Sequence, residues 1–430
     1  MKLAIIADDL TGANDSGVQL ARHGLKTAVL FEMDGANTKH YEAVVFDTDS
    51  RSIKHTEAYE KVKQAAQFLV DAGFDFIFKK LDSTMRGNIG AEIDAIYDVL
   101  KPHFMMIAPG YPKNNREIRH STHYLNKIPL GETEIAKDPK TPVTISYLPD
   151  LLQQQTDRAI AAITIDDLVQ GEAHIADMLK QYADQGIPYL IIDSTEEEHL
   201  QQILAYTKHL PYQFAWVGSA GIANYLPEHY GIAVKQKSST IPANNGPILT
   251  VVGSVNINSR VQLNKLLEEG NVYAIPFESY KALSSPADRE HEISKVYKLA
   301  YEKAVAGLDV VIYSTAEQAD IEQAWKVGEA QGLSHTEISN EIVKAIGNVC
   351  SMLLEKQLFK GVSMTGGDTA KQICSLWGIK GFELLDELEI GVPISKFLGI
   401  EHLHVITKAG GFGSERVFIH AINKLKGDHQ

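Results

Sequence analysis

Leu3-Ala4-Ile5-Ile6-Ala7-Asp8-Asp9-Leu10-Thr11-Gly12 joins an uninterrupted apolar run to two carboxylates and a Thr-Gly pair. An apolar run of this length predicts a strand covered on both faces, as in a parallel sheet layered with helices. The amphipathic residues 14–23 that follow stop at Gly24, as a helix does. The stretch therefore predicts a strand-to-helix unit whose two aspartates lie at the carboxyl end of the strand, where open α/β sheets bind ligands.

The same alternation of apolar runs and amphipathic segments continues through the chain and predicts an α/β fold with mainly parallel sheets. Further helices are predicted at residues 56–72, which stop at Gly73, and at residues 88–100, which stop before Lys101-Pro102. The strands predicted in the first half are residues 27–31, 43–47, 74–79, 104–108, 161–165 and 189–193. In the second half we predict strands at residues 248–252, 309–313, 361–364, 390–394 and 402–407, and helices at residues 258–269 and 339–355.

A polar stretch near the middle of the chain, residues 235–247, contains two prolines and no apolar period. Such a composition does not bury enough surface to fold by itself and is typical of a linker. The chain of 430 residues also exceeds the roughly 250–300 residues at which a single core stops growing. We therefore expect two α/β domains, residues 1–236 and 247–430, each a mainly parallel sheet layered with helices.

The composition excludes several classes of protein. With 44% hydrophobic and 22% charged residues, and no apolar run of the roughly 20 residues that a membrane helix needs, the chain is expected to be neither membrane-embedded nor disordered. The net charge of −14 argues against nucleic-acid binding, which depends on clustered Lys and Arg. The only cysteines, Cys350 and Cys374, form no Cys-x-x-Cys motif, and the N-terminus turns acidic at Asp8 before a signal-peptide core forms, so we expect a cytoplasmic protein.

Polar side chains follow three predicted strands of the first domain. Asp8 and Asp9 are suited to accept hydrogen bonds from sugar hydroxyls or to take a proton from an attacking hydroxyl, although an aspartate here also caps helices. Arg51 offers the guanidinium fork that matches a carboxylate, with a surface ion pair to a neighbouring aspartate as the alternative. Lys79-Lys80-Leu81-Asp82-Ser83-Thr84-Met85-Arg86-Gly87-Asn88 repeats the design with cations, a carboxylate and hydroxyls. Together the three strand ends predict one site for a hydroxylated, anionic small molecule.

The loop at residues 108–116 follows another predicted strand and is suited to close over that site, although we expect Lys113 to face the solvent. His120 and His123 lack the Glu and the second spacing of a zinc motif, so we expect structural roles for them. No metal ligand is assigned from the sequence.

Glycine-rich turns in the second domain are suited to phosphates. Gly366-Gly367-Asp368-Thr369 combines two glycines that let the backbone approach a ligand with a Thr hydroxyl at a helix N-terminus. Lys408-Ala409-Gly410-Gly411-Phe412-Gly413 adds a second flexible turn and a cation suited to phosphate. Gly253-Ser254 adds a third, for which a plain strand-to-helix turn is the alternative. None matches the P-loop or the dinucleotide-binding fingerprint, so these residues predict a phosphate site without naming the nucleotide.

These motifs, taken in order, resemble those of the four-carbon acid sugar kinase family, a former family of unknown function. The resemblance rests on residues 6–13, 47–51, 79–88, 218–221, 366–369 and 408–413 and covers nearly the whole chain. It implies an N-terminal domain that holds a sugar acid, a C-terminal domain that holds ATP, and an active site in the cleft between them. The resemblance implies substrate contacts at Asp9, Arg51, Lys80, Leu81, Asp82 and Ser83. The residue pattern adds Arg86 to this set. The ATP contacts are Ser254, Gly366, Gly367, Asp368, Thr369 and Gly410, to which the glycine-rich pattern adds Lys408 and Gly411.

The continuation at residues 12–19 is more similar to the branch of the family that acts on D-threonate than to the 3-oxo-tetronate branch. Residues 114–116 and 119–123 depart from the Gly-Arg-Thr and Gly-His-His segments that relatives usually carry. We predict an ATP-dependent kinase of the terminal 4-hydroxyl of a four-carbon sugar acid, D-threonate to 4-phospho-D-threonate in the first place, with D-erythronate and 3-oxo-tetronate as alternatives. Asp9 is the predicted base and Asp82 the second candidate, with Mg²⁺ neutralising the phosphates.

Two other classes of protein fit less of the sequence. A sugar-acid sensor leaves the glycine-rich second domain unexplained, and a dehydrogenase lacks its fingerprint here. The partners that we expect are a small sugar acid and a second copy of the chain, since homodimers are the commonest oligomers, with neither nucleic acid nor a membrane. We also expect the two domains to close over their ligands, which excludes water from the transfer.

Overall fold

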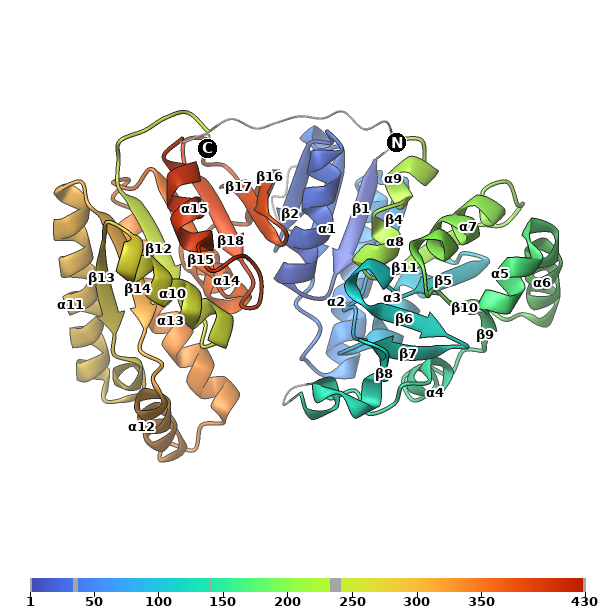
Figure 1. Cartoon of the computed structure of the whole chain (residues 1–430), viewed down its shortest axis with the longest axis horizontal. Helices are drawn as coiled ribbons and strands as arrows, with labels where there is room; N and C mark the ends of the chain where they lie inside the picture. The colour runs from blue at the N-terminus through green and yellow to red at the C-terminus, as the bar shows by residue number, and fades with distance from the viewer. Residues whose placement is uncertain (1, 34–37, 139–140, 233–240, 428–430) are drawn as a thin grey trace. The chain divides into compact units, whose positions relative to one another are not determined.

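The computed structural model describes residues 2–33, 38–138, 141–232 and 241–427. The chain divides into two compact units, Met1–Lys237 and Ser238–Gln430 (Figure 1), and each is described by itself. Of the predicted linker, residues 235–240 lie outside the described residues, and residues 241–247 contain no helix or strand.

The first unit is built on a parallel sheet of eight strands in the order β2-β3-β1-β4-β11-β5-β10-β9. Its central strands are buried along almost their whole length, as their uninterrupted apolar runs predict. The strands are β1 (Leu3–Ala7), β2 (Thr27–Leu30), β3 (Ala43–Asp47), β4 (Phe76–Lys80), β5 (Phe104–Ala108), β9 (Ile160–Ile163), β10 (Tyr189–Ile192) and β11 (Phe214–Gly218).

Helices of the first unit present an apolar stripe to the sheet. In α2 (His55–Asp71) the buried residues include Ala58, Val62, Ala65 and Leu69, whose spacing of three and four residues keeps them on one side of the helix. The other helices are α1 (Leu10–Arg22), α3 (Ile89–Leu100), α4 (Leu148–Gln153), α5 (Ile165–Gln170), α6 (Glu172–Gln185), α7 (Glu197–Thr207), α8 (Ala220–Ala223) and α9 (Leu226–His229).

A small antiparallel sheet follows β5 and consists of β6 (Arg116–Arg119), β7 (Thr122–Leu125) and β8 (Ile128–Pro129). Two-residue turns, His120-Ser121 and Asn126-Lys127, join the strands, and all four turn residues have positive φ. Such turns match the twist of the strands that they connect. The sequence does not predict this sheet, because its turns lack the Asn-Gly and Asp-Gly pairs that usually mark a tight hairpin.

The second unit is built on a sheet of seven strands in the order β13-β14-β12-β15-β18-β17-β16. Neighbours are parallel except that β17 is antiparallel to both β18 and β16. The strands are β12 (Ile248–Val252), β13 (Val272–Phe277), β14 (Asp309–Ser314), β15 (Gly361–Thr365), β16 (Gly381–Glu389), β17 (Val392–Phe397) and β18 (His404–Lys408). The helices are α10 (Ile257–Glu269), α11 (Pro286–Val305), α12 (Gln318–Glu329), α13 (His335–Leu354), α14 (Gly367–Leu376) and α15 (Val417–Leu425).

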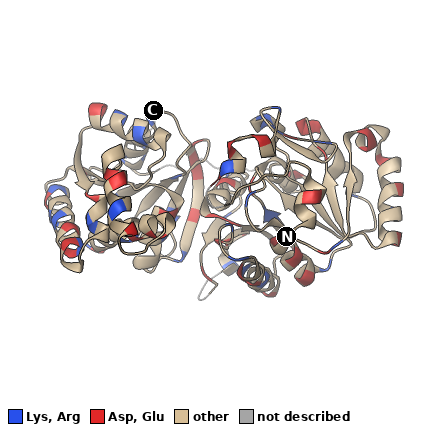
Figure 2. Cartoon of the chain, turned by 90° about the horizontal axis from the view of Figure 1, so that it is seen from below, with Lys and Arg blue, Asp and Glu red and all other residues tan. Residues whose placement is uncertain are grey.

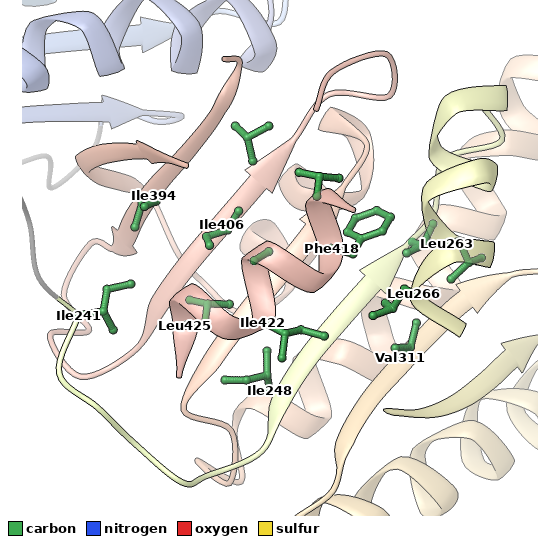
Figure 3. Close-up of a cluster of buried hydrophobic side chains, with 14 residues drawn as sticks. Ile241, Ile248, Leu263, Leu266, Val311, Ile394, Ile406, Phe418, Ile422 and Leu425 are labelled. Atoms are coloured by element: carbon green, nitrogen blue, oxygen red, sulfur yellow. The ribbon is translucent and has the colours of Figure 1, made fainter. Parts of the chain in front are cut away.

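Figure 3 shows a hydrophobic core of the second unit, in which α15 packs against the sheet. Phe418, Ile422 and Leu425 lie on one side of α15, since they are spaced by four and three residues. They belong to one buried cluster with Ile248 of β12 and Ile406 of β18. The second unit therefore has a core of its own.

The predicted α/β fold class is confirmed, but several elements differ from their predicted bounds: α13 begins at His335 rather than at residue 339, and β9 ends at Ile163 rather than at residue 165. The strand predicted at residues 390–394 is wrong in position, because Ile390 and Gly391 form the turn between β16 and β17. Ile390 is 81% exposed, and Gly391 has a φ of 74°, which glycine adopts without strain. The helix predicted at residues 14–23 begins earlier, at the start of α1, because Asp9 caps it.

The charged side chains of the outer helices, the helices themselves and the two cysteines of the described residues have ordinary environments. Figure 2 shows acidic and basic residues interspersed on the outer helices. Within the described ranges, no helix combines the length and the apolar character needed to span a membrane. Cys350 and Cys374 are buried without a disulfide, and burial raises the pKa of both thiols well above its ordinary value, so neither is an activated nucleophile.

Candidate functional site

The direction in which the chain adds strands reverses at the centre of the first sheet, although all the strands are parallel. The connection from β1 runs one way to β2, whereas the connection from β3 runs the other way to β4, so right-handed crossovers place α1 and α2 on opposite faces. Open α/β sheets bind ligands at such a point, outside the carboxyl ends of the strands. There Ala7 of β1 is level with Asp47 of β3 and Lys80 of β4. The residues that follow these three strands therefore meet at one edge.

Arg51 joins the two aspartates that follow β1. Its Nε and Nη2 donate to the two carboxylate oxygens of Asp8 at 2.6 and 3.1 Å, and its Nη1 donates to Asp9 Oδ2 at 2.7 Å. The Arg51 side chain is only 16% exposed, so these charge-assisted bonds are shielded from water. Arg51 is thus part of a buried cluster rather than of a surface ion pair.

Asp9 belongs both to this cluster and to α1. Its Oδ1 accepts a hydrogen bond from the Gly12 N–H at 2.8 Å, which caps the helix. Burial raises the pKa of Asp9 above its ordinary value against the opposing charge of Arg51, and the negative charge of Asp8 raises it further. For Asp8, burial is outweighed by the charges of Arg51 and Lys79, which hold its pKa below the ordinary value. Asp9 is therefore the aspartate of this pair that takes up a proton more readily.

Asp82 follows β4 and is held by its own loop. Arg86 donates from Nε and Nη2 to the two carboxylate oxygens at 2.8 and 3.1 Å, and the Thr84 hydroxyl donates to Oδ2. Burial alone raises the pKa of Asp82, but hydrogen bonds from Arg86 and Thr84 and the charge of Arg51 lower it far below the ordinary value. Asp82 therefore stays ionised and is a poor proton acceptor.

A buried ion pair lies beneath this edge of the sheet. Lys79 Nζ of β4 is 2.8 Å from Glu92 Oε2 of α3, and both side chains are almost completely buried. The other carboxylate oxygen of Glu92 accepts a hydrogen bond from the Ser50 hydroxyl at 2.6 Å. The pair thus connects a strand, a helix and the loop that carries Arg51, and it holds the guanidinium in place.

Lys80 and Gly12 complete the cluster around Asp9. Lys80 Nζ donates to the carbonyl oxygen of Leu81 at 2.7 Å. A methyl group on Gly12 would lie 2.9 Å from Asp9 Oδ1 and 3.2 Å from Lys80 Nζ. The ammonium and the carboxylate therefore share the space that glycine leaves open.

The remaining predicted residues of this site differ in how far their side chains are accessible to a ligand. Leu81 is fully buried, so that only its backbone is available to a ligand, whereas Ser83 is half-buried. Arg86 also donates from Nη1 to Asp138 Oδ2 at 3.2 Å. A pocket of about 190 Å³ opens beside Arg51, with walls from the loop before α3, from residues 141–143 and from α4. This volume is below the range of roughly 300–1,000 Å³ for drug-sized ligands and suits a smaller molecule.

The loop and hairpin after β5 contain residues that differ in their exposure to solvent. Lys113 faces the solvent, with 66% of its side chain exposed. His120 is exposed, but His123 is completely buried. In the part of the chain that the structure describes, no group of three or more His, Cys, Asp or Glu residues is arranged to hold a metal ion.

Three glycine-containing turns meet at the carboxyl edge of the second sheet. Val252, Thr365 and Lys408 end the neighbouring strands β12, β15 and β18 and are level with one another. Gly366, with a φ of 95°, precedes α14, and no side chain caps this helix. The N–H groups of the first turn of α14 are therefore open to an anion at this edge.

Glycine is required here because a side chain would fill the space. A methyl group on Gly253 would lie 2.2 Å from Thr369 Oγ1, and one on Gly410 would lie 3.1 Å from Ser254 Oγ. The hydroxyls of Ser254 and Thr369 thus border the same glycine-lined space, and Asp368 is exposed in the same helical turn. Backbone N–H groups and hydroxyls in this arrangement fit phosphate.

Lys408 is turned inward under its own loop. Its Nζ donates to the carbonyl oxygens of Ala409 and Gly410 at 2.8 and 3.0 Å and lies 3.4 Å from Ser259 Oγ. Burial lowers the pKa of Lys408 to about 8. The ammonium therefore holds the turn that carries Gly410, and it reaches a phosphate only by leaving these acceptors.

The protein therefore consists of two α/β units. The first has carboxylates and cations at the carboxyl edge of its sheet, and the second has turns at that edge whose N–H groups and hydroxyls fit phosphate. Two family models match accordingly. A sugar-binding N-terminal domain matches residues 3–226, and a nucleotide-binding C-terminal domain matches residues 249–418. The first of these matches alone spans more than half of the chain.

Relatives along the full length are sugar-acid kinases by name. The D-threonate kinase of Salmonella typhimurium is 29% identical over 98% of each chain. The D-erythronate kinase of Heliobacterium modesticaldum is 28% identical over 96% of this chain and 94% of its own. The 3-oxo-tetronate kinase of Pseudomonas fluorescens is 26% identical over 99% and 97%. A solved structure from Salmonella typhimurium, provisionally named a tRNA synthase, has a TM-score of 0.82 at 25% identity and covers 98% of each chain. The chain belongs to the four-carbon acid sugar kinase family.

Proposed function

We propose that the protein is an ATP-dependent kinase that phosphorylates the terminal hydroxyl of a four-carbon sugar acid, with D-threonate as the first-choice substrate. The observation that carries this proposal is the Asp9 cluster. A carboxylate with a raised pKa lies beside two cations at a sheet edge that follows a reversal of strand order. This arrangement suits a substrate that is both hydroxylated and anionic.

Asp9 is the proposed base. It takes the proton of the terminal hydroxyl while that oxygen attacks the γ-phosphorus of ATP, and the bond from the γ-phosphorus to the leaving ADP oxygen breaks. Its raised pKa favours this role, whereas the strongly lowered pKa of Asp82 makes that residue the weaker candidate. Asp82 instead fixes Arg86, and Arg51 and Lys80 supply positive charge next to the substrate.

The second unit is the proposed ATP site. Ser254, Thr369 and the N–H groups of Gly366 and Gly367 would hold the phosphates, and Asp368 and Gly410 would border them. The glycines of this edge support the assignment, since side chains there would occupy the ligand space. Mg²⁺ is expected to enter with the nucleotide and to neutralise the phosphate charge.

The choice among four-carbon acids follows the relatives. D-threonate is preferred because the D-threonate kinase of Salmonella typhimurium is 29% identical over 98% of this chain. D-erythronate and 3-oxo-tetronate are the alternatives, because kinases with these names also match along the full length.

The test is ADP release with Mg-ATP in the presence of D- and L-threonate, D- and L-erythronate, 3-oxo-tetronate and the parent four-carbon sugars. We expect a strong response to one acid and little response to the neutral sugars. Silence across the panel with ATP still bound would reject a four-carbon substrate. Absence of nucleotide binding would favour a sugar-acid sensor.

A further inference from the structure

The hairpin of β6 and β7 presents one polar pair on its inner face. Ile118 is directly opposite His123 in the register, and Arg116 is opposite Leu125. Because side chains alternate along a strand, these four residues share a face. Ile118, His123 and Leu125 on that face are buried, whereas Arg119 on the other face is exposed. Arg116 and His123 are therefore polar groups on the covered side of the hairpin.

The backbone of this hairpin is firmly attached to the first unit. Ile118 exchanges two backbone hydrogen bonds of 2.9 Å with Ser194, which follows β10. The carboxylate of Asp193 accepts bonds from the N–H groups of His120 and Ser121 at 2.6 and 2.8 Å. The inner face is therefore held in a fixed position at the carboxyl edge of the sheet.

Asp82 and its loop lie close to this inner face. The chain that follows β8 reaches the loop through the ion pair of Asp138 with Arg86, at 3.2 Å. The charge of Asp82 also raises the pKa values of Arg116 and His123, against the larger lowering by burial. The hairpin and the proposed substrate site are thus neighbours within one unit.

Both inner-face groups retain unused hydrogen-bonding atoms. The two ring nitrogens of His123 and the Nε of Arg116 are buried and have no hydrogen-bond partner among the described residues. Buried polar atoms are seldom left unpaired, because each loses its hydrogen bonds to water and gains none within the protein. Burial lowers the pKa of His123 to about 4, so at neutral pH its ring has one donor and one acceptor.

Arg116 also differs from Arg51 in whether its guanidinium pairs with carboxylates. Arg51 already forms close bonds with two carboxylates. Among the described residues, Arg116 forms no ion pair with a carboxylate and donates from Nη1 to the carbonyl oxygen of Asn114. Its positive charge therefore remains available to an anionic ligand at this edge.

We propose that Arg116 binds the carboxylate of the sugar acid and that His123 recognises its secondary hydroxyls, so that the hairpin sets the preference between stereoisomers. A neutral imidazole is able to accept from one hydroxyl and donate to the next, which matches the vicinal diol of a four-carbon sugar acid. This inference rests on the proposed function, because it takes the sugar acid as the ligand of the first unit.

Equilibrium binding by calorimetry tests the role of Arg116 without turnover. We expect Arg116→Gln to weaken D-threonate binding by about 30-fold or more, since it removes a charged partner of the carboxylate. Affinity for threitol, the neutral polyol, should be the same in wild type and variant. Arg119→Gln is the matched control on the exposed face of the same strand, and its affinities should equal those of wild type. Equal losses for threonate and threitol in Arg116→Gln would overturn the carboxylate assignment.

Two variants test His123. His123→Phe keeps the ring shape and removes both nitrogens, so we expect about tenfold weaker binding of the preferred acid and a threonate-to-erythronate affinity ratio closer to one. Its melting temperature should not fall, because unpaired buried nitrogens are removed. His123→Asn, which keeps a donor and an acceptor, should restore part of the ratio. A lower melting temperature with an unchanged ratio would make His123 a structural residue and overturn its assignment.

The two levels of the proposal fail differently. If wild type releases ADP with an acid and the Arg116 and His123 variants bind that acid normally, the hairpin assignment fails and the kinase assignment stands. If wild type neither binds nor phosphorylates any four-carbon acid, both fail.

Discussion

In the proposed mechanism, Asp9 combines a structural role with a chemical one. It caps α1 through Gly12 and contacts Arg51 through its other oxygen. Because the cap and the ion pair fix both oxygens, the carboxylate is held in one orientation, as a positioned base needs to be. Its raised pKa adds the affinity for a proton that the role requires.

Replacing Asp9 with Asn should separate catalysis from binding. We expect kcat to fall by about 10²–10⁴-fold, the usual contribution of a general base, while the KM for the sugar acid changes much less. Steady-state ADP release at saturating ATP measures both constants. A near-normal kcat would remove Asp9 from the base role.

The pH profile should report the same carboxylate. A base acts only when deprotonated, so kcat/KM should fall as the pH drops through the pKa of Asp9. Because that pKa is raised, the acid limb should lie above the ordinary aspartate value of about 4. A profile that stays flat below this value would contradict the assignment.

Gly12→Ala is a second test at the residue scale. The added methyl group would press on Asp9 Oδ1 at 2.9 Å and on Lys80 Nζ at 3.2 Å. Since a displacement of about 1 Å near the chemistry is able to cost about 10²-fold in rate, we expect a loss of activity of that order with the fold retained. Activity and circular dichroism together check this, and a fully active variant would show that the cluster tolerates displacement.

At the scale of single elements, the Lys79–Glu92 pair connects β4 and α3 beneath the site. Removing one partner of a buried pair leaves an uncompensated charge, so Glu92→Ala should lower the free energy of unfolding by about 3–5 kcal/mol. Urea denaturation measures this loss. The apolar double variant Lys79→Met with Glu92→Leu should recover most of it, because no charge is then left alone.

A surface pair provides the control for that experiment. Glu269→Gln removes the charge that contacts Lys265 and Arg416 at the surface and should change stability little. A loss in Glu92→Ala as small as that of the control would show that the buried pair is unimportant to the fold.

The turn after β18 allows a comparison of adjacent glycines. A methyl group on Gly410 would meet Asn256 and Ser254 at 3.0 and 3.1 Å, whereas one on Gly411 meets no atom within 4 Å. We expect Gly410→Ala to weaken ATP binding by about tenfold, which corresponds to about 1.4 kcal/mol, and Gly411→Ala to have a smaller effect. Calorimetric titration with a non-hydrolysable ATP analogue measures both, and equal affinities in the two variants would argue against a tight turn at Gly410.

At the scale of the whole molecule, each unit has its own sheet and its own core. Such units fold independently in many proteins. We expect residues 241–430 expressed alone to fold and to bind the ATP analogue, but to release no ADP in the presence of a sugar acid. Circular dichroism and calorimetry provide the measurements, and an unfolded fragment would show that the first unit is needed for stability.

Much of the fold and part of the site follow from local sequence patterns. The predicted strands at residues 3–7, 43–47, 104–108 and 248–252 match β1, β3, β5 and β12. Apolar runs and glycine stops suffice for this, because they depend on the periodicity of nearby residues. The polar residues after β1, β3 and β4 follow from the same pattern, since parallel strands end at one edge.

The partners of the site residues were decided by the tertiary structure. Arg51 lies 43 residues from Asp8 in the sequence, and no local pattern indicates that it binds Asp8 and Asp9. The inward turn of Lys408 and the burial of His123 likewise depend on which strands and turns become neighbours. The sequence by itself determined most strands of the two main sheets, some of the helices and the edge at which polar groups gather, because these depend on local periodicity. Only the tertiary structure decided which charges are paired and which remain available to a ligand, because pairing depends on distances between segments far apart in the chain.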